Sequence, residues 1–434
     1  MPEVNIGDLL VSLYDLLGWL LGVIGLHSSA VSVLQKLVSG FVLANFVLLT
    51  PIFTIWVERK VAARFQDRLG PNRVGPFGLF QSFADVIKLV IKEDITPTGA
   101  DKVIFNIGPV LAVMSVVGIW AVIPFASTMV GTDMNVGILY SVAVGAIGTL
   151  AIMMGGWASN NKYALLGAFR TVSQLVSYEV PMIIALLVPT LLAGSMRMND
   201  IVAEQQVWFI VAAPLAMLVF LISSIAEVGR APFDLLEAES EIVAGFHVEY
   251  TGMKFGVWML AEFVHAFTIS ALTAVVFLGG WRGPLVDQYP LLGVIYFLTK
   301  TYVVYLLLLW IRVTLPRVRI DQMNNLNWKF LVPLSLAVLV VTALVGKAVP
   351  AGVSVGGRSL VLFLANVALF VISIIILARF SRNLQAAEQI SVDMSGARVA
   401  ANLTALQILL LVLGAVAILA ILVTATQLVL GLTA

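Results

Sequence analysis

The stretch EVGRAPFDLLEAESE at residues 227–241 places five carboxylates between two long apolar runs. With Glu249, six of the 24 acidic residues of the chain fall within residues 227–249. The rest of the chain is very different, since 60% of its 434 residues are hydrophobic and only 11% are charged. A soluble protein needs charged residues at roughly a quarter of its positions. The composition therefore predicts an all-α polytopic membrane protein in which this acidic stretch joins two membrane helices.

Ten apolar runs are long enough to cross a membrane as helices, which takes about 20 residues each. They lie at residues 31–57, 103–126, 136–158, 176–194, 207–226, 255–280, 290–311, 330–349, 359–379 and 405–431. A further run at residues 9–26 carries Asp15. We interpret it as an interfacial helix, with a short membrane span as the alternative. The N-terminus is acidic at Glu3 and Asp8, whereas a signal peptide begins with basic residues.

The distribution of Lys and Arg predicts the orientation of the chain in the membrane. Nineteen of the 25 basic residues fall in alternate loops, with Arg379 assigned to the last of them. These loops are residues 58–102, 159–175, 227–254, 312–329 and 380–404. Because basic residues are retained on the cytoplasmic side, the long loops are expected to be cytoplasmic. Both ends of the ten-helix set then face outward.

The first long loop, at residues 58–94, combines charge with an amphipathic pattern. It begins with Glu58 and Arg59, and Gly-Pro pairs at residues 70–71 and 75–76 then impose a stiff turn. Apolar residues recur at helical spacing from Leu79 to Ile91, opposite a polar face. This pattern predicts an amphipathic helix along the membrane surface. Its lysines meet anionic lipid in one interpretation, and it walls a membrane-level cavity under a soluble partner in the other.

Three acidic residues belong to the membrane segments rather than to the loops. Glu179 and Glu262 lie within the cytoplasmic halves of two spans, and Glu227 ends a third. An ionised carboxylate there costs a few kcal/mol unless it is paired or hydrated. Each is therefore a candidate functional residue, with structural pairing or solvation as the alternative.

The loop acids extend this group toward the cytoplasm. If residues 234–241 are helical, Asp234, Glu237 and Glu241 share one face. Their protons would then be shared, and some of their pKa values would be raised toward neutrality. Glu239 faces another way. A solvated loop that contacts partner subunits is the alternative.

Composition also limits the chemistry of this chain. It has no cysteine and only three scattered histidines, so no thiolate-ligated iron–sulfur cluster or metal site is expected in it. The net charge of +1 gives no indication of a nucleic-acid partner. Electrons for any redox reaction must arrive from another protein.

Four long motifs resemble the H subunit of respiratory complex I, the bacterial NADH:quinone oxidoreductase. They are the loop at residues 58–94, GAFRTVSQLVSYE at 167–179, AEVGRAPFDLLEAESEIVAGFHVEYTGMKFGVWMLAEF at 226–263, and WIRVTLPRVRIDQMNNLNWKFLVPLSL at 310–336. The resemblance implies eight family helices within a membrane domain at residues 31–349. Residues 1–30 are then an N-terminal interfacial segment, and residues 350–434 are an extension with two additional helices.

The resemblance further implies a function in a bacterial cell membrane. The protein would form the membrane side of a quinone-binding chamber and couple quinone reduction to proton pumping. Quinone would be the substrate, with no iron–sulfur cluster, flavin or metal in this chain. Its partners would be lipid, the soluble quinone-site and iron–sulfur subunits, and the small and antiporter-like membrane subunits.

The motif match also assigns individual residues. The counterparts of the acidic proton pathway are Glu179, Glu227, Asp234, Glu237, Glu239, Glu241 and Glu262. The residues that line or support the quinone chamber are Glu58, Arg59, Arg64, Phe65, Arg68, Asp85, Lys88 and Arg230. The structural or docking residues of the last cytoplasmic loop are Arg312, Arg317, Arg319 and Asp321.

Two alternative functions remain open from the sequence. The related membrane component of proton-pumping hydrogenases and formate hydrogenlyase-type complexes shares the architecture, although RLGPNRVGP and APFDLLEAESE favour the quinone enzyme. A secondary transporter would carry ions past acids at the midplane between inverted repeats. The sequence shows no such repeat, and its acids gather on one side. The choice between ubiquinone and menaquinone is not determined.

Overall fold

The computed structural model describes residues 9–23, 27–236, 239–350 and 354–391, and these residues form helices without any strand. The all-α prediction is therefore confirmed. Eight helices in this part of the chain are long and apolar enough to cross a membrane. They are α2 (Ser28–Phe65), α4 (Lys102–Ile119), α5 (Gly137–Ala158), α6 (Lys162–Ala193), α11 (Gly252–Phe277), α12 (Pro290–Thr314), the continuous helix Ile320–Ala348, and the apolar part Val355–Ile375 of α15.

A shorter helix, α9 (Pro214–Val228), occupies the centre of the bundle. Nearly every one of its side chains is buried, including Phe220 and Leu221. It follows the four-residue helix α8 (Phe209–Ala212), and together they account for the span expected at residues 207–226. The tenth expected span, at residues 405–431, lies outside the described residues. The count of ten therefore stays a prediction.

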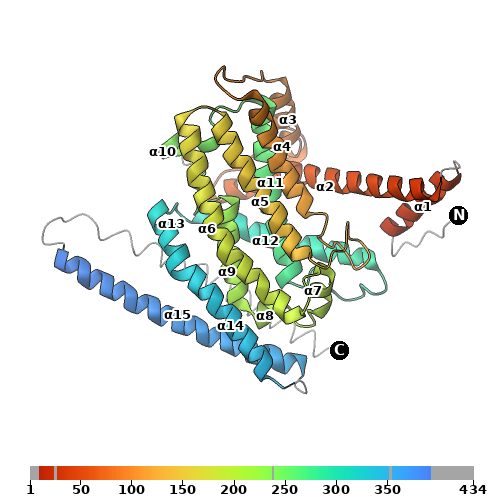
Figure 1. Ribbon diagram of the computed structural model, residues 1–434. Helices are drawn as coiled ribbons and strands as arrows, with labels where there is room; N and C mark the ends of the chain where they lie inside the picture. Colours follow the sequence, from red (N-terminus) through yellow and green to blue (C-terminus); the bar gives the residue numbers. More distant parts are fainter. Residues whose placement is uncertain (1–8, 24–26, 237–238, 351–353, 392–434) are drawn as a thin grey trace.

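The helices around α9 stand side by side, as Figure 1 shows for α4, α5, α6 and α11. Close approach between α5 and α6 requires Gly156, because a Cβ there would lie 2.4 Å from the Cβ of Ala168. Membrane helices associate through such close packing, since lipid tails are as apolar as the side chains that they replace. Away from the bundle, α2 extends toward α1 (Leu9–Val23), and the side chains of Leu37 and Phe41 on it are exposed.

The short helices α3 (Gln81–Ile91), α10 (Glu239–Ile242), α7 (Met198–Glu204) and α8 lie at the two ends of the bundle. The amphipathic helix α3 and the helix α10 lie at one end, and α7 and α8 lie at the other (Figure 1). The amphipathic helix predicted from the first long loop is confirmed as α3. Its apolar side chains Phe83, Ile87 and Val90 are exposed.

Two stretches that the sequence assigned to loops are helical instead. Residues 162–175 form the first turns of α6, which is 32 residues and about 48 Å long. Residues 320–331 form α13 (Ile320–Leu326) and the π-helical turn η4 (Asn327–Leu331), which continue into α14 (Val332–Ala348). Hydropathy detects the lipid-facing part of a helix, and the polar turns beyond the hydrocarbon core escape it.

The N-terminal helix α1 has 15 residues and is about 22 Å long. A hydrocarbon core of about 30 Å is thicker than this helix. The length of α1 therefore favours the interfacial interpretation over a membrane span.

The C-terminal helix α15 (Val355–Ser391) packs against α14, α8 and α9. Its Asn366 is buried, and the side-chain amide donates to the carbonyl of Ala212 at 3.2 Å. That carbonyl ends α8 where Pro214, which lacks an N–H, begins α9. Helix α15 thus supplies a hydrogen bond at the break between α8 and α9.

Asn366→Leu is expected to destabilise the full-length chain by about 1 to 2 kcal/mol, because the carbonyl of Ala212 loses its partner. Thermal unfolding of the protein purified in detergent measures this loss. Leu364→Ala, at a position on α15 that is 57% exposed, is the matched control and should cause a much smaller change. Equal losses in the two variants would contradict the role of this hydrogen bond.

Candidate functional site

The site begins where α9 ends. Gly229 closes the helix with φ 72°, and a Cβ at this position would lie 2.3 Å from the side chain of Leu236. The chain therefore turns sharply directly before Arg230. On α6, the side-chain amide of Gln174 donates to the carbonyls of Ala226 at 2.6 Å and Phe233 at 2.8 Å. One buried side chain thus holds both sides of the turn.

Arg230 lies between two carboxylates and is only 7% exposed. Its Nη1 lies 2.8 Å from Oε2 of Glu58 on α2, and its Nε lies 3.0 Å from Oε1 of Glu262 on α11. The guanidinium also lies over the ring of Phe263, 4.7 Å from the ring centroid. The arginine ties the loop after α9 to two membrane helices.

Glu58 receives two more partners from α12. Arg312 forms an ion pair with Oε1 of Glu58, and the hydroxyl of Tyr305 lies 3.4 Å from Oε2. Two arginines and two glutamates thus form one network with balanced formal charge. We name it the Arg230 network; its members are Glu58, Arg230, Glu262 and Arg312. Buried charges are tolerable when they are paired in this way.

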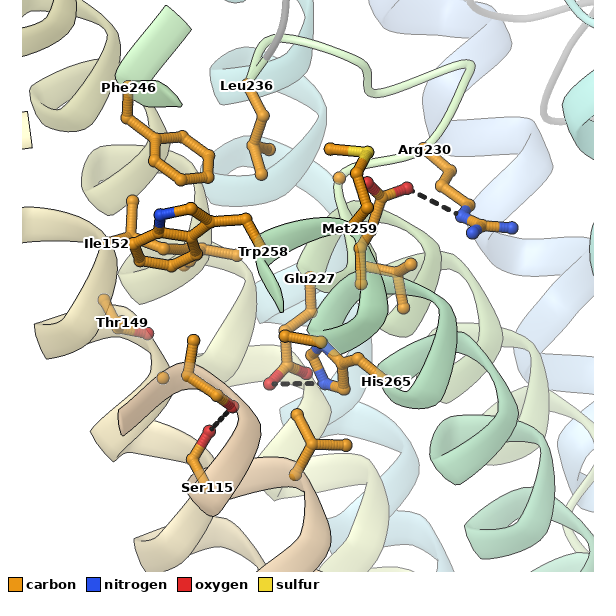
Figure 2. A pocket seen from close by; sticks show the side chains of 18 of the residues that line it. Ser115, Thr149, Ile152, Glu227, Arg230, Leu236, Phe246, Trp258, Met259 and His265 are labelled. Carbon is orange, nitrogen blue, oxygen red and sulfur yellow. Dashed lines mark hydrogen bonds and ion pairs between the residues drawn. The ribbon is translucent and has the colours of Figure 1, made fainter. Parts of the chain in front are cut away.

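A pocket lies beside this network, between α4, α5, α9 and α11, as Figure 2 shows. Its volume of about 110 Å³ has room for several water molecules. Ser115 and Thr149 lie along one wall. The charged and titratable residues that line it are Glu227, Arg230, Asp234, His247, Glu262, His265 and Arg312. Three of the acids predicted for the proton pathway therefore meet at one pocket.

Glu227 and His265 face each other within this pocket (Figure 2). Oε1 of Glu227 lies 3.9 Å from Nε2 of His265, and the two side chains are 15% and 20% exposed. Glu179 on α6 is half-buried and close enough to Glu227 for the two carboxylates to interact electrostatically. Glu179 does not line the pocket itself.

A second pocket, of about 400 Å³, has Glu58 in its wall. This volume falls in the range of about 300–1,000 Å³ that is usual for small-molecule sites. Its lining residues are Glu58, Arg59, Ala62, Arg68, Gly70 and Pro71. Glu58 therefore belongs to the wall of this second pocket and to the Arg230 network, whose other members line the first pocket.

The remaining residues predicted for the chamber lie along α2 and α3. Asp85 accepts from Arg59 at 2.5 Å and lies 3.4 Å from Lys88. Burial alone would raise the pKa of Asp85, but the hydrogen bond and charge of Arg59, together with Lys88, lower it. Arg64 and Phe65 are exposed at the end of α2. The structure does not bring these two side chains to either pocket.

The continuous helix that would place Asp234, Glu237 and Glu241 on one face is not formed. Residues 234–236 are not helical, and α10 begins only at Glu239. Pro232 and the turn that Gln174 holds favour an extended path, which local periodicity could not reveal. Glu237 and the side chain of Glu239 lie outside the described residues.

Glu241 has a different environment from the one expected. Arg170 donates to it at 2.6 Å, and Arg317 forms a second ion pair with it. The hydrogen bond from Arg170 lowers the pKa of Glu241 against a smaller effect of burial, and the charges of both arginines act in the same direction. Glu241 is therefore not one of the acids whose pKa is raised. Glu241 connects α6 to the loop before α13.

His247, in the short helix η3 (Gly245–His247), borders the first pocket among aromatic rings. Its side chain is buried, and its ring lies 5.0 Å from that of Phe246. Burial lowers the pKa of His247 to about 4. The imidazole is therefore neutral at neutral pH.

Sequence reasoning missed His265 and Gln174 as parts of the site, and it assigned Arg312 only a structural or docking role. A signal for His265 was present, because it follows Glu262 by three residues and so shares its helix face. No local signal marks Gln174 or Arg312, whose partners lie 52 and 254 residues away or more along the chain. Within the described parts of the chain, no three His, Asp or Glu side chains are grouped so that they could hold a metal ion.

The fold and the site define a multi-pass helical membrane protein with a paired charge network between two pockets. The sequence profile of the NADH dehydrogenase family matches residues 38–343. The NADH-quinone oxidoreductase H subunit of Dehalococcoides mccartyi (strain CBDB1) is 50% identical over 310 residues, covering 71% of this chain and 86% of that protein. The corresponding H subunit of Geobacillus kaustophilus is 48% identical over 308 residues, covering 70% of this chain and 92% of that protein.

A third relative is an NADH-quinone oxidoreductase H subunit of Geobacter sulfurreducens. It is 46% identical over 308 residues, covering 68% of this chain and 92% of that protein. The chain belongs to the NADH dehydrogenase family, among the H subunits of NADH-quinone oxidoreductases. The family predicted from the four motifs is thereby confirmed.

Arg230→Met is expected to destabilise the protein by about 3 to 5 kcal/mol, because Glu58 and Glu262 lose a buried counter-charge. Thermal unfolding of the purified protein measures the loss. The double variant Arg230→Met/Glu262→Gln should recover part of it, since one of the stranded charges is removed. Arg59→Met breaks an ion pair whose arginine is 46% exposed, so it should cost less than about 1 kcal/mol. A double variant as unstable as the sum of its single variants would contradict the network.

His247 predicts a pH dependence of stability. The folded state holds its pKa near 4, whereas an unfolded histidine titrates near 6.5. Between these values the unfolded state binds more protons, so stability falls as the pH decreases from about 6.5 to about 4. Thermal unfolding at pH 7 and pH 5 should therefore differ more in the wild type than in His247→Gln. An equal difference in both proteins would contradict the prediction.

Proposed function

We propose that this chain is the membrane subunit of a proton-translocating NADH:quinone oxidoreductase. In this proposal it forms the membrane side of the quinone-binding chamber and couples quinone reduction to proton pumping. Quinone reduction to quinol takes up two electrons and two protons. The chain has no cysteine, so thiolate-ligated iron–sulfur clusters that deliver the electrons belong to partner subunits.

The names of the relatives support the reaction, since each is the H subunit of an NADH-quinone oxidoreductase. They favour this function over the hydrogenase-type alternative. The single observation that carries the mechanism is the position of Glu58. It lines the second pocket, which we propose as the chamber wall, and binds Arg230 and Arg312, which line the pocket of the pathway acids.

Coupling follows from the electrostatics of this arrangement. A change of charge near Glu58 alters its attraction for Arg230, which in turn is shared with Glu262 at 3.0 Å. Paired charges in a medium of low dielectric constant respond strongly to such changes. In this proposal, a change of charge in the chamber is transmitted through Arg230 to the acids of the pathway. The acids that we propose for the pathway remain Glu179, Glu227, Asp234, Glu237, Glu239, Glu241 and Glu262.

The proposal also includes sidedness, partners and domains. The end of the bundle that carries α3 and α10 faces the cytoplasm and the soluble subunits, where the exposed apolar face of α3 contacts a partner or lipid. Residues 31–349 form the family domain, which the profile match at residues 38–343 supports. Residues 350–434 form an extension whose described helix α15 packs on α14, α8 and α9.

Glu227→Gln in the assembled complex is expected to lower NADH-driven proton translocation by on the order of 10²-fold, because the amide cannot exchange a proton. Inverted membrane vesicles report translocation, and quinone reduction is measured in parallel. NADH oxidation by a soluble artificial acceptor, which bypasses this chain, should stay at the wild-type rate.

The matched control is Asp94→Asn, an acid-to-amide change at the same end of the bundle. Asp94 is 51% exposed and pairs with Lys254 at 2.9 Å. This variant should pump as the wild type does. Wild-type pumping in both Glu227→Gln and Glu262→Gln would overturn the proposed pathway.

A further inference from the structure

We propose that His265 is a proton-relay residue that connects Glu227 to the Arg230 network. The proposal rests on the function proposed above and adds a residue that the acidic motifs do not contain. It places an imidazole, the side chain best suited to exchange protons near neutral pH, between carboxylates of two different helices.

The spacing of Glu262 and His265 along α11 is the first observation that supports the relay. Glu262 and His265 are three residues apart and so lie one turn apart on the same face of the helix. Glu262 binds Arg230 at 3.0 Å, whereas His265 faces Glu227 on α9 at 3.9 Å. One face of α11 therefore carries a member of the Arg230 network and, one turn further along, the imidazole of His265, and both line the pocket (Figure 2).

A gap separates the side chains of Glu227 and His265. A distance of 3.9 Å is too long for a direct hydrogen bond. The pocket has room for several waters, and the hydroxyls of Ser115 and Thr149 line it. Oε2 of Glu227 is buried without a hydrogen-bond partner in the protein. Both groups thus face a space in which water can bridge them.

His265 shares the pocket with charged side chains of both signs. A neighbouring cation disfavours a charged imidazole, whereas a neighbouring carboxylate favours it. The groups that face the pocket from the packed elements are Glu227, Arg230, Asp234, His247, Glu262 and Arg312, with Glu179 beyond Glu227.

The transfer itself moves protons only. One ring nitrogen of His265 accepts a proton from the carboxyl of Glu227 through water, which leaves a carboxylate and an imidazolium. The other ring nitrogen then releases its proton into the pocket toward the network. The imidazole is neutral again with its tautomer exchanged, and no electron is transferred.

His247 shows what a histidine without this role looks like in the same structure. It borders the same pocket, but it is only 6% exposed and packs against the rings of Phe246 and Phe255. His265 is 20% exposed through the pocket and has a carboxylate before it. The two residues therefore form a matched pair for experiment.

The test compares His265→Gln, Glu227→Gln and the double variant in the assembled complex. Glutamine keeps a polar side chain but cannot carry the proton. We expect His265→Gln to lower NADH-driven proton translocation about tenfold or more, while His247→Gln stays near the wild type. NADH oxidation by a soluble artificial acceptor should not change in washed membranes, which shows that the NADH-oxidising part of the complex remains attached to the membrane part.

The double variant separates a relay from a structural role. Residues of one relay give non-additive losses, so Glu227→Gln/His265→Gln should pump no less than the poorer single variant. Wild-type pumping in His265→Gln, a loss equal to that in His247→Gln, or additive losses in the double variant would overturn the relay. If Glu227→Gln and Glu262→Gln also pump normally, the proposed function fails as well. If Glu227→Gln is defective and His265→Gln is normal, only this inference fails.

Discussion

The ion pairs of Arg230 with Glu58 and Glu262 are the interaction on which the rest of the site depends. A single guanidinium can satisfy two carboxylates because its five donors point in fixed and different directions. It thereby joins α2, the loop after α9 and α11, and Arg312 adds α12 through Glu58. Removing the arginine would leave Glu262 without its ion-pair partner and Glu58 with Arg312 alone. The carboxylates of Glu58 on α2 and Glu262 on α11 are therefore held together by this one residue.

The same network relates the two pockets to each other. The second pocket is bordered by the end of α2 and the turn at Gly70, and the first by α4, α5, α9 and α11. Glu58 belongs to the wall of the second pocket, while its arginine partners line the first one. Energetic coupling between sites requires an element that both sites influence. In the proposed function, a carboxylate shared between two arginines is such an element, since a change in its charge changes its attraction for both.

Particular residues show how far the sequence could predict this site. The membrane acids Glu227 and Glu262 were recognisable because a carboxylate within an apolar run is costly and therefore informative. The sequence predicted only in part that these acids would lie close together, because Asp234 reaches their pocket from an extended loop and not from the expected helix. Glu241 was expected to share protons with Asp234, but it pairs instead with Arg170 and Arg317. Those partners come from distant segments, so local spacing could not reveal them.

The sequence by itself determined the class of protein, the approximate positions of the membrane helices and the family. Hydropathy depends on the composition of each segment, and long motifs are specific without any knowledge of contacts. Only the tertiary structure decided that α6 begins at Lys162, that α9 is the buried centre, and that His265 faces Glu227. These features depend on which helix faces meet. The packing of the whole bundle determines which faces meet. A network of paired charges is stable only where all of its charged side chains come together.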